Sequence, residues 1–94
     1  MELKQGSVLF ARIDSPIEGK EVSQETIGEC MAYLDTLSKE RYFLAGTFGN
    51  ANGAMILFEA KDIDEAQKIS DADPIIKSGC YEYKLYEWHL HVLS

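Results

Sequence analysis

Few residues of this 94-residue chain could carry out chemistry, and the first of them is Asp73, in the Asp73-Pro74 pair. A carboxylate at a pocket mouth could act as a general base or orient a substrate hydroxyl. Alternatively, Asp73 accepts backbone N–H bonds at the following turn, in an Asx or N-cap role before Pro74. The residues alone leave both roles open.

The two cysteines are the next candidates. Cys30 and Cys80 lack CxxC spacing and are too few for a disulfide framework or a zinc site, so reduced thiols are expected. Cys30 falls on an apolar helical stripe, which favours a small core residue. A nucleophilic thiolate would need a cationic neighbour or a helix N-terminus to lower its pKa from roughly 8.5. Nothing basic is adjacent in sequence, so the nucleophile role is not favoured.

Glu87, His89 and His91 share one face of an extended segment, and such a trio could bind a divalent metal. The alternative is a solvated face, because the opposite face carries Trp88, Leu90 and Val92. The second interpretation is favoured, and the sequence predicts no metal site.

The elements that would position these residues follow from hydrophobic periodicity. Strands are predicted over residues 7–14, 42–48, 54–60 and 80–93, with a hairpin turn at 49–53 and a short turn at 75–79. Helices are predicted over residues 23–40 and from 63 to the Asp73-Pro74 pair. The apolar parity of the last strand switches at Leu85 and Tyr86, which predicts a bulge or bend there.

Helix signals support this assignment. Ser23 and Asp62 are predicted N-caps, with Glu65 as a capping-box partner of Asp62. The apolar positions of the two helices form two stripes, Ile27, Cys30, Met31, Leu34 and Leu37 in the first and Ile63, Ala66 and Ile69 in the second.

The order β-α-β-β-α-β predicts an α+β, ferredoxin-like fold with a four-stranded antiparallel sheet, in a single domain over residues 1–94. Two helices can cover only one face of such a sheet. Yet the first strand carries Val8 and Phe10 on one face, and Leu9 and Ala11 on the other. Because soluble proteins seldom expose large apolar patches, we expect a homodimer that buries the helix-free sheet face.

Composition excludes several classes of function. A net charge of −7 opposes binding to nucleic acid or to an anionic membrane, since such binding depends on Lys and Arg. No apolar run approaches the roughly 18 residues of a membrane span, and no signal-like amino terminus is present, so a cytoplasmic protein is expected. A Gly-rich phosphate loop and a clear haem ligand are also missing, so no cofactor is predicted.

With these residues in place, the chain resembles the YciI-like (YCII-related) family of the dimeric α/β-barrel group, from about residue 27 to 88. The resemblance rests on four motifs in order: CMAYLDTL from Cys30, LAG from Leu44, MILFEA with Glu65-Ala66, and ADPIIKSG from Ala72. It implies a small-molecule pocket between helix and sheet in each subunit. Relatives in the wider group include muconolactone isomerases, dehydrochlorinases and monooxygenases.

The resemblance also implies a working pair, an Asp and a His on the first helix. The Asp matches Asp73, whereas the His position is Cys30 here. Three further positions depart from the pattern: Ile27 stands for an Arg, Thr47 for a Pro and Ile75 for an aromatic residue.

Cys30, Tyr33 and Thr47 are the expected ligand-binding residues. These changes favour a small-molecule-binding protein with a degenerate site; the alternative is a lyase or isomerase that uses Asp73 as general acid/base on an aromatic or enol-like compound.

Overall fold

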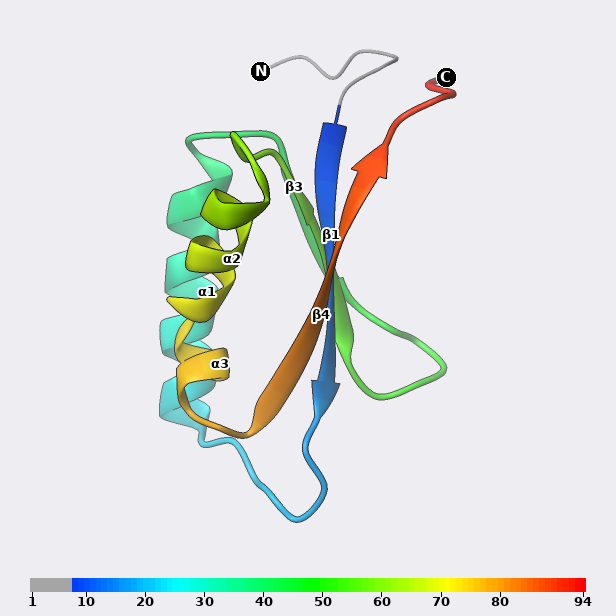
Figure 1. Cartoon of the computed structure of the whole chain (residues 1–94). Helices are drawn as coiled ribbons and strands as arrows, with labels where there is room; N and C mark the ends of the chain where they lie inside the picture. The colour runs from blue at the N-terminus through cyan, green and yellow to red at the C-terminus, as the bar shows by residue number, and fades with distance from the viewer. Residues whose placement is uncertain (1–7) are drawn as a thin grey trace.

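The computed structural model describes residues 8–94, in which one layer of helices covers one side of a twisted sheet (Figure 1). Seven elements follow one another along the chain: β1 (Val8–Pro16), α1 (Gln24–Ser38), β2 (Phe43–Thr47), β3 (Ala54–Phe58), α2 (Ile63–Asp71), α3 (Pro74–Lys77) and β4 (Tyr81–His89).

The four strands form one antiparallel sheet in the order β2-β3-β1-β4. This is the strand order of the ferredoxin-like arrangement, so the predicted α+β fold with a four-stranded antiparallel sheet is confirmed. Arg12 of β1 lies opposite Ile56 of β3 on one side and opposite Leu85 of β4 on the other. Directly opposed residues point to the same face, so this register fixes which side chains meet the helices.

The helices begin where their capping residues predict. Ser23 accepts a hydrogen bond from the Thr26 N–H at the start of α1, and Asp62 accepts one from the Glu65 N–H at the start of α2. The capping box of α2 differs from the prediction, because the Glu65 carboxylate accepts the Lys61 N–H instead of the Asp62 N–H. The bond has moved one residue upstream, but it still satisfies an otherwise unpaired donor.

The core lies between α1, α2 and the helix-facing side of the sheet. Its buried members come from both layers: Phe10, Cys30, Leu34, Leu37, Ile56, Phe58 and Ala66. Three predicted stripe residues lie outside it: Met31 is 61% exposed, Ile63 is 41% exposed, and Ile27 is half-buried away from this cluster. The outer residues of both helical stripes therefore remain in contact with water.

Two predictions were wrong at the carboxyl end. Residues 75–79 are not a simple turn, because Pro74 opens the one-turn helix α3, which follows α2 after its end at Asp71. Pro suits the first helical position, where no N–H bond is lost. The last strand ends at His89 instead of residue 93.

The predicted bulge at Leu85 and Tyr86 is also wrong, since β4 pairs with β1 without interruption from Tyr81 to His89. The apolar parity switches for a different reason. Tyr83 and Leu85 face the helix layer, whereas Tyr86 and Trp88 face the other side of the same regular strand. What changes along β4 is therefore the face that carries apolar residues and not the path of the backbone.

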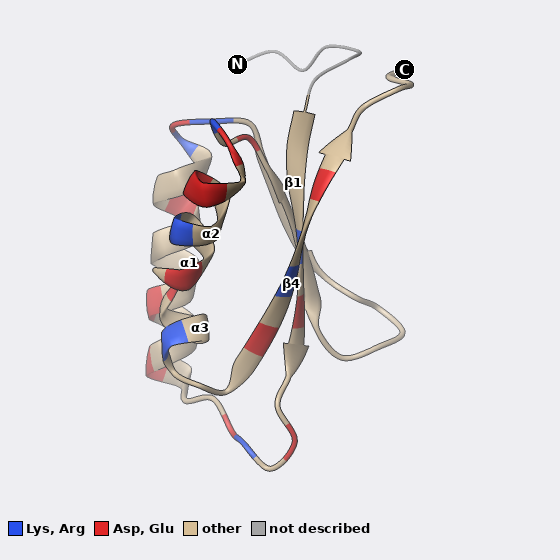
Figure 2. Ribbon diagram, in the orientation of Figure 1, with Lys and Arg blue, Asp and Glu red and all other residues tan. Residues whose placement is uncertain are grey.

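The helix-free face of the sheet carries exposed apolar side chains on both outer strands and on β3. Leu44, Met55, Tyr86 and Trp88 are all between 43% and 54% exposed there. Charged residues lie mainly on the helices and loops, and the hairpin between β2 and β3 has none (Figure 2). We call this surface, defined by Leu44, Met55, Tyr86 and Trp88, the open sheet face.

Candidate functional site

The candidate site is built around Arg12, a cation buried under the helix layer. Alternation along β1 places Phe10, Arg12 and Asp14 on the helix-facing side of the sheet. Only 1% of Arg12 and 4% of Asp14 are exposed, and Asp73 is fully buried. Buried charges are rare unless they are paired, and these three residues are paired with one another.

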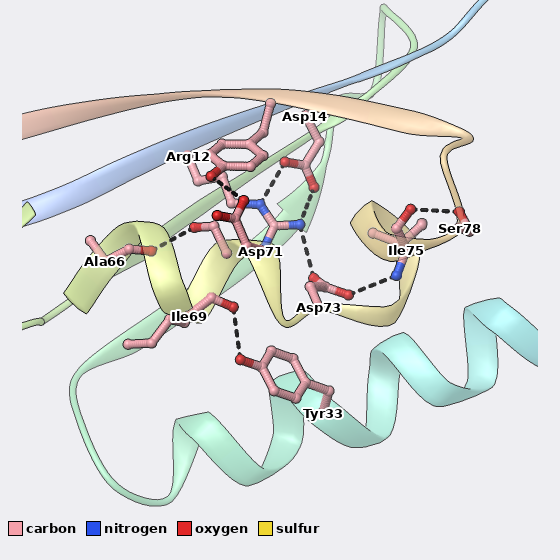
Figure 3. A network of polar contacts seen from close by, with 11 residues as sticks. Arg12, Asp14, Tyr33, Ala66, Ile69, Asp71, Asp73, Ile75 and Ser78 are labelled. Carbon is pink, nitrogen blue, oxygen red and sulfur yellow. Dashed lines mark hydrogen bonds and ion pairs between the residues drawn. The ribbon is translucent and has the colours of Figure 1, made fainter. Parts of the chain in front are cut away.

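Arg12 binds both carboxylates at once (Figure 3). Its Nε donates to Asp14 Oδ1 at 2.7 Å, and its Nη2 donates to Asp14 Oδ2 at 2.7 Å. The same Nη2 also donates to Asp73 Oδ2 at 2.8 Å. The planar guanidinium matches a carboxylate in this two-bond geometry, which gives a strong and well-oriented pair.

Asp73 is held in place from its other side by the backbone. Its Oδ1 accepts the Ile75 N–H at 3.0 Å, and Asp73 is the N-cap of α3. The N-cap role considered from the sequence is therefore confirmed. Since Arg12 takes the second oxygen, Asp73 ties the middle of β1 to the junction of α2 and α3.

Tyr83 covers this charged group from β4. Its ring lies 5.7 Å from the Arg12 guanidinium carbon, and its hydroxyl donates to Asp71 Oδ1 at 2.6 Å. Burial, followed by the hydrogen bond to Asp71, raises the pKa of Tyr83 to about 12. Tyr83 is therefore a neutral hydrogen-bond donor that helps to exclude water from Arg12.

One guanidinium shared by two carboxylates leaves an excess negative charge in a dry environment. Burial raises the pKa of Asp14, and this effect outweighs the opposing influence of Arg12, while Asp73 adds repulsion. Burial alone would lower the pKa of Arg12, but its two carboxylate partners raise it. Arg12 therefore stays charged, and Asp14 is the member of the group that is easier to protonate than an ordinary aspartate.

A cleft of about 760 Å³ opens beside Asp14, between α1 and strands β2 and β3. Apolar side chains dominate its walls, and the polar side chains on it are Asp14, Cys30, Asp35, Ser38, Thr47 and Tyr81. A cleft of this size and composition, with few polar groups, is typical of small-molecule sites. Its position agrees with the pocket between helix and sheet that the resemblance implied.

The predicted site residues are distributed unequally around this cleft. Cys30 and Thr47 line it. Tyr33 is not among the lining residues, and its hydroxyl donates to the Ile69 carbonyl at 2.7 Å, which ties α1 to α2. Asp73 does not line the cleft either. Its neighbours Cys30, Asp14 and Ile75 do line it, so Asp73 lies directly behind the cleft wall.

Sequence reasoning missed Arg12 and Asp14. Both stand in the apolar first strand at i and i+2, so they share one face, and that face also carries Phe10. A charged pair within a buried strand was the available signal, since charge is almost never buried without a partner. Gly53 adds a local constraint, because a Cβ at this position, where φ is +111°, would overlap the Asp14 carbonyl oxygen.

Cys30 is a buried residue that lines the cleft, and its thiol is unreactive. Burial raises the pKa of its thiol to about 12, and a hydrogen bond to Asp73 and the charge of Asp73 act in the same direction. The thiol is therefore neutral at physiological pH. A neutral thiol is a poor nucleophile and a poor proton relay.

The third candidate group of the sequence does not assemble a metal site. His89 Nε2 lies 2.8 Å from Glu87 Oε2 on the exposed part of β4. Within residues 8–94 no group of three or more His, Cys, Asp or Glu side chains is placed to hold a metal ion. In the same part of the chain, no helix has the length and apolar character needed to cross a membrane.

The fold and the cleft together define a ferredoxin-like α+β protein with a candidate small-molecule site between helix and sheet. Residues 8–89 match the model of the YCII-related domain. A Bacillus subtilis (strain 168) protein, uncharacterized protein YjpA, is 36% identical over 69 residues, which are 72% of this chain and 81% of that protein. The chain belongs to the YCII-related family.

A solved structure shares the fold at greater sequence distance. The chain is similar to the 5-chloro-2-hydroxyhydroquinone dehydrochlorinase TftG of Burkholderia phenoliruptrix AC1100, whose structure is a complex with 2,5-dihydroxybenzoquinone. The TM-score is 0.73 at 22% identity, over 85% of this chain and 92% of that one. At this identity the likeness establishes the common fold.

The raised pKa of Asp14 predicts a pH dependence of stability. Above pH 3.8, the ordinary value, the folded protein retains a proton that the unfolded chain has released. The resulting stabilisation is complete below that pH and is lost as pH rises through the pKa of Asp14 in the folded protein. The unfolding free energy of the wild type should therefore fall relative to that of Asp14→Asn over this window. Urea titrations of both proteins at matched pH measure the difference, and a relative gain by the wild type would contradict it.

The neutral state of Cys30 predicts slow alkylation. In a Cys80→Ser variant, iodoacetamide should label native Cys30 at least about a hundredfold more slowly than the urea-unfolded chain, since both burial and a raised pKa suppress the thiolate. The matched Cys30→Ser variant reports Cys80, which is partly exposed, under the same conditions. Rapid labelling of native Cys30 at neutral pH would show that the thiol is reactive after all.

Proposed function

We propose that this protein binds a small, largely apolar organic molecule in the cleft between α1 and strands β2 and β3, with Asp14 as the principal polar contact. The supporting observation is the cleft itself, about 760 Å³ in volume, with a buried carboxylate on its wall. Cys30 and Thr47 would contact the same ligand from α1 and β2. Tyr33 would act from outside the wall by holding α1 against α2.

Binding without chemistry is favoured over catalysis because neither position of the working pair that the family resemblance implies, Asp73 and Cys30, is suited to transfer a proton to or from a ligand in the cleft. Asp73 is fully buried and bound to both Arg12 and the Ile75 N–H, so it has no direct path to a ligand. Cys30, at the position where the family resemblance places a His, carries a thiol whose pKa is about 12. General acid/base catalysis works best with groups whose pKa lies near the working pH.

A lyase or isomerase activity with Asp73 as general acid/base is the second candidate. It is favoured by the fold shared with a dehydrochlorinase and by the connection of Asp73 to the cleft through Arg12 and Asp14. Its substrate would be a small aromatic or enol-like compound. Turnover of such a compound by the wild type, lost in Asp73→Asn while binding persists, would replace the first candidate by this one.

Filling the cleft tests the binding proposal. Ala45 lies opposite Ile56 on the helix-facing side of the sheet and lines the cleft, so Ala45→Phe should occupy part of it. We expect phenol, hydroquinone or 2-phenylethanol to shift the amide NMR signals of Cys30, Thr47 and Gly53 in the wild type. In Ala45→Phe the affinity for these compounds should fall about tenfold or more, because the phenylalanine ring occupies the space in the cleft that the compound would fill.

A matched variant controls for the added ring. Ala32 is exposed on α1 and does not line the cleft, so Ala32→Phe should bind the aromatic compounds as the wild type does. If none of the compounds shifts the cleft signals of the wild type, or if Ala45→Phe binds them unchanged, the cleft is not the binding site.

We also propose that two copies of the chain associate through the open sheet face. The proposal is supported by the exposed side chains of Leu44, Met55, Tyr86 and Trp88, which lie on the side of the sheet away from the helices. Apolar patches of this kind mark interaction surfaces, and a two-fold dimer lets one patch bury itself against its copy.

The dimer predicts a solution mass of twice 10.6 kDa by light scattering at micromolar concentration. Met55→Glu should shift the protein toward the single chain, because it places a charge in the buried face. Ile63→Glu is the matched control, since Ile63 is exposed to a similar extent but lies on α2 in the other layer. A single-chain mass for the wild type would contradict the dimer.

A further inference from the structure

The charged side chains that line the cleft are all of one sign. Asp14 lies on its buried wall, and Asp35 contributes from α1 with a side chain that is 67% exposed. No lysine, arginine or histidine of residues 8–94 belongs to the lining. An anionic ligand would therefore meet carboxylates and no compensating cation.

Arg12, the buried cation beside Asp14, is already paired with two carboxylates. Arg12 is not part of the cleft wall, and its charge is shared between Asp14 and Asp73. One positive and two negative charges leave a net charge of −1 in a group whose members are at most 4% exposed. Buried charge without a counter-charge is costly, so a positive group at the cleft side of Asp14 would complete the pairing.

Asp14 also keeps unused hydrogen-bond capacity. Each of its oxygens accepts one bond from Arg12. An ionised carboxylate has about four acceptor sites, so a donor in the cleft can bind without displacing Arg12. An ammonium group supplies three donors and a positive charge, and charge-assisted bonds of this kind are about twice as strong as neutral ones.

Most of the remaining wall is apolar. Ile27 and Leu34 come from α1, Ile56 comes from β3, and Ile75 comes from α3. Such walls bind hydrocarbon or ring surface, and they offer little to a strongly hydrated ligand. The ligand should therefore combine one positive end with an apolar body.

We propose that the cleft selects a small organic cation, a primary amine on an aromatic or alkyl body, whose ammonium group donates to Asp14. This inference rests on the proposed binding function and names the chemical class of its ligand. Asp35 has a cationic partner in Lys39, whose Nζ lies 3.2 Å from its carboxylate, so Asp35 contributes less than Asp14.

Three compounds of nearly the same shape but different charge test the proposal on the wild-type protein: phenethylamine, 2-phenylethanol and phenylacetate. Binding is followed by the amide NMR shifts of Cys30, Thr47 and Gly53 at neutral pH and low salt. We expect phenethylamine to bind about tenfold or more tightly than 2-phenylethanol, and phenylacetate to bind more weakly than either.

Two variants assign the preference to one carboxylate. Asp14→Asn should remove the advantage of phenethylamine over 2-phenylethanol, whereas Asp35→Asn should change it by about twofold at most, as expected for an exposed charge. Circular dichroism establishes that both variants are folded. If Asp14→Asn does not fold, the comparison of the three compounds on the wild type still decides the question.

The outcomes separate this inference from the binding proposal. Equal binding of phenethylamine and 2-phenylethanol, or tighter binding of phenylacetate, would overturn the cation preference and leave the binding function standing. If none of the three compounds shifts the cleft signals, the cation preference fails, and the binding function fails with it when phenol and hydroquinone also leave these signals unchanged. A preference for phenethylamine that persists in Asp14→Asn would assign it to another group and overturn the role of Asp14.

Discussion

The structure depends on one buried arginine that pairs with two carboxylates in a site from which water is excluded. Arg12 is bound in two-bond geometry to Asp14 and by a third bond to Asp73, and all three side chains are buried. Asp14 is near in sequence, but Asp73 is 61 positions away, at the junction of α2 and α3. The Arg12–Asp73 ion pair therefore joins the helix layer to the sheet at one defined point.

The same arrangement holds the carboxylates at and behind the cleft wall. The hydrogen bonds of Arg12 and the N-cap bond from Ile75 hold both carboxylates in fixed positions. Gly53 allows the hairpin to approach the Asp14 backbone closely, so the cleft wall forms against β1. In the proposed binding function, a carboxylate that is already held in this way would lower the ordering cost of binding.

Much of the fold could be predicted from the sequence, because periodicity and caps are local signals. Ser23 and Asp62 begin helices as expected, and the βαββαβ order yields the observed sheet. The parity switch of β4 was misinterpreted, since a pattern in one strand cannot say which face a distant helix covers. Met31 was placed in the core for the same reason: its helical spacing is right, but the helix layer leaves that side open.

The site was only partly predictable. Asp73 and Cys30 were identified from the sequence, and the structure places them next to each other. Arg12 and Asp14 were not, although two charged residues two positions apart in an apolar strand were a local signal; what no local pattern encodes is the partner of Arg12 at Asp73, 61 positions away. The burial of Asp73 could not be predicted either, since its carboxylate meets Arg12 of β1 and the Ile75 N–H of α3 only in the folded chain.

The central role of Arg12 is tested most directly by the unfolding free energies of Arg12→Met and Arg41→Met, each compared with the wild type by urea titration at neutral pH. Arg12→Met leaves two buried carboxylates without a cation, and we expect a loss of about 3–5 kcal/mol. Arg41 is the matched control, because its side chain is 20% exposed and its ion pairs with Glu40 and Glu65 are 3.5 Å long. Losing these two ion pairs in Arg41→Met should lower the unfolding free energy by about 1 kcal/mol or less. Equal losses for the two variants, or a loss below about 1 kcal/mol for Arg12→Met, would contradict the central role of Arg12.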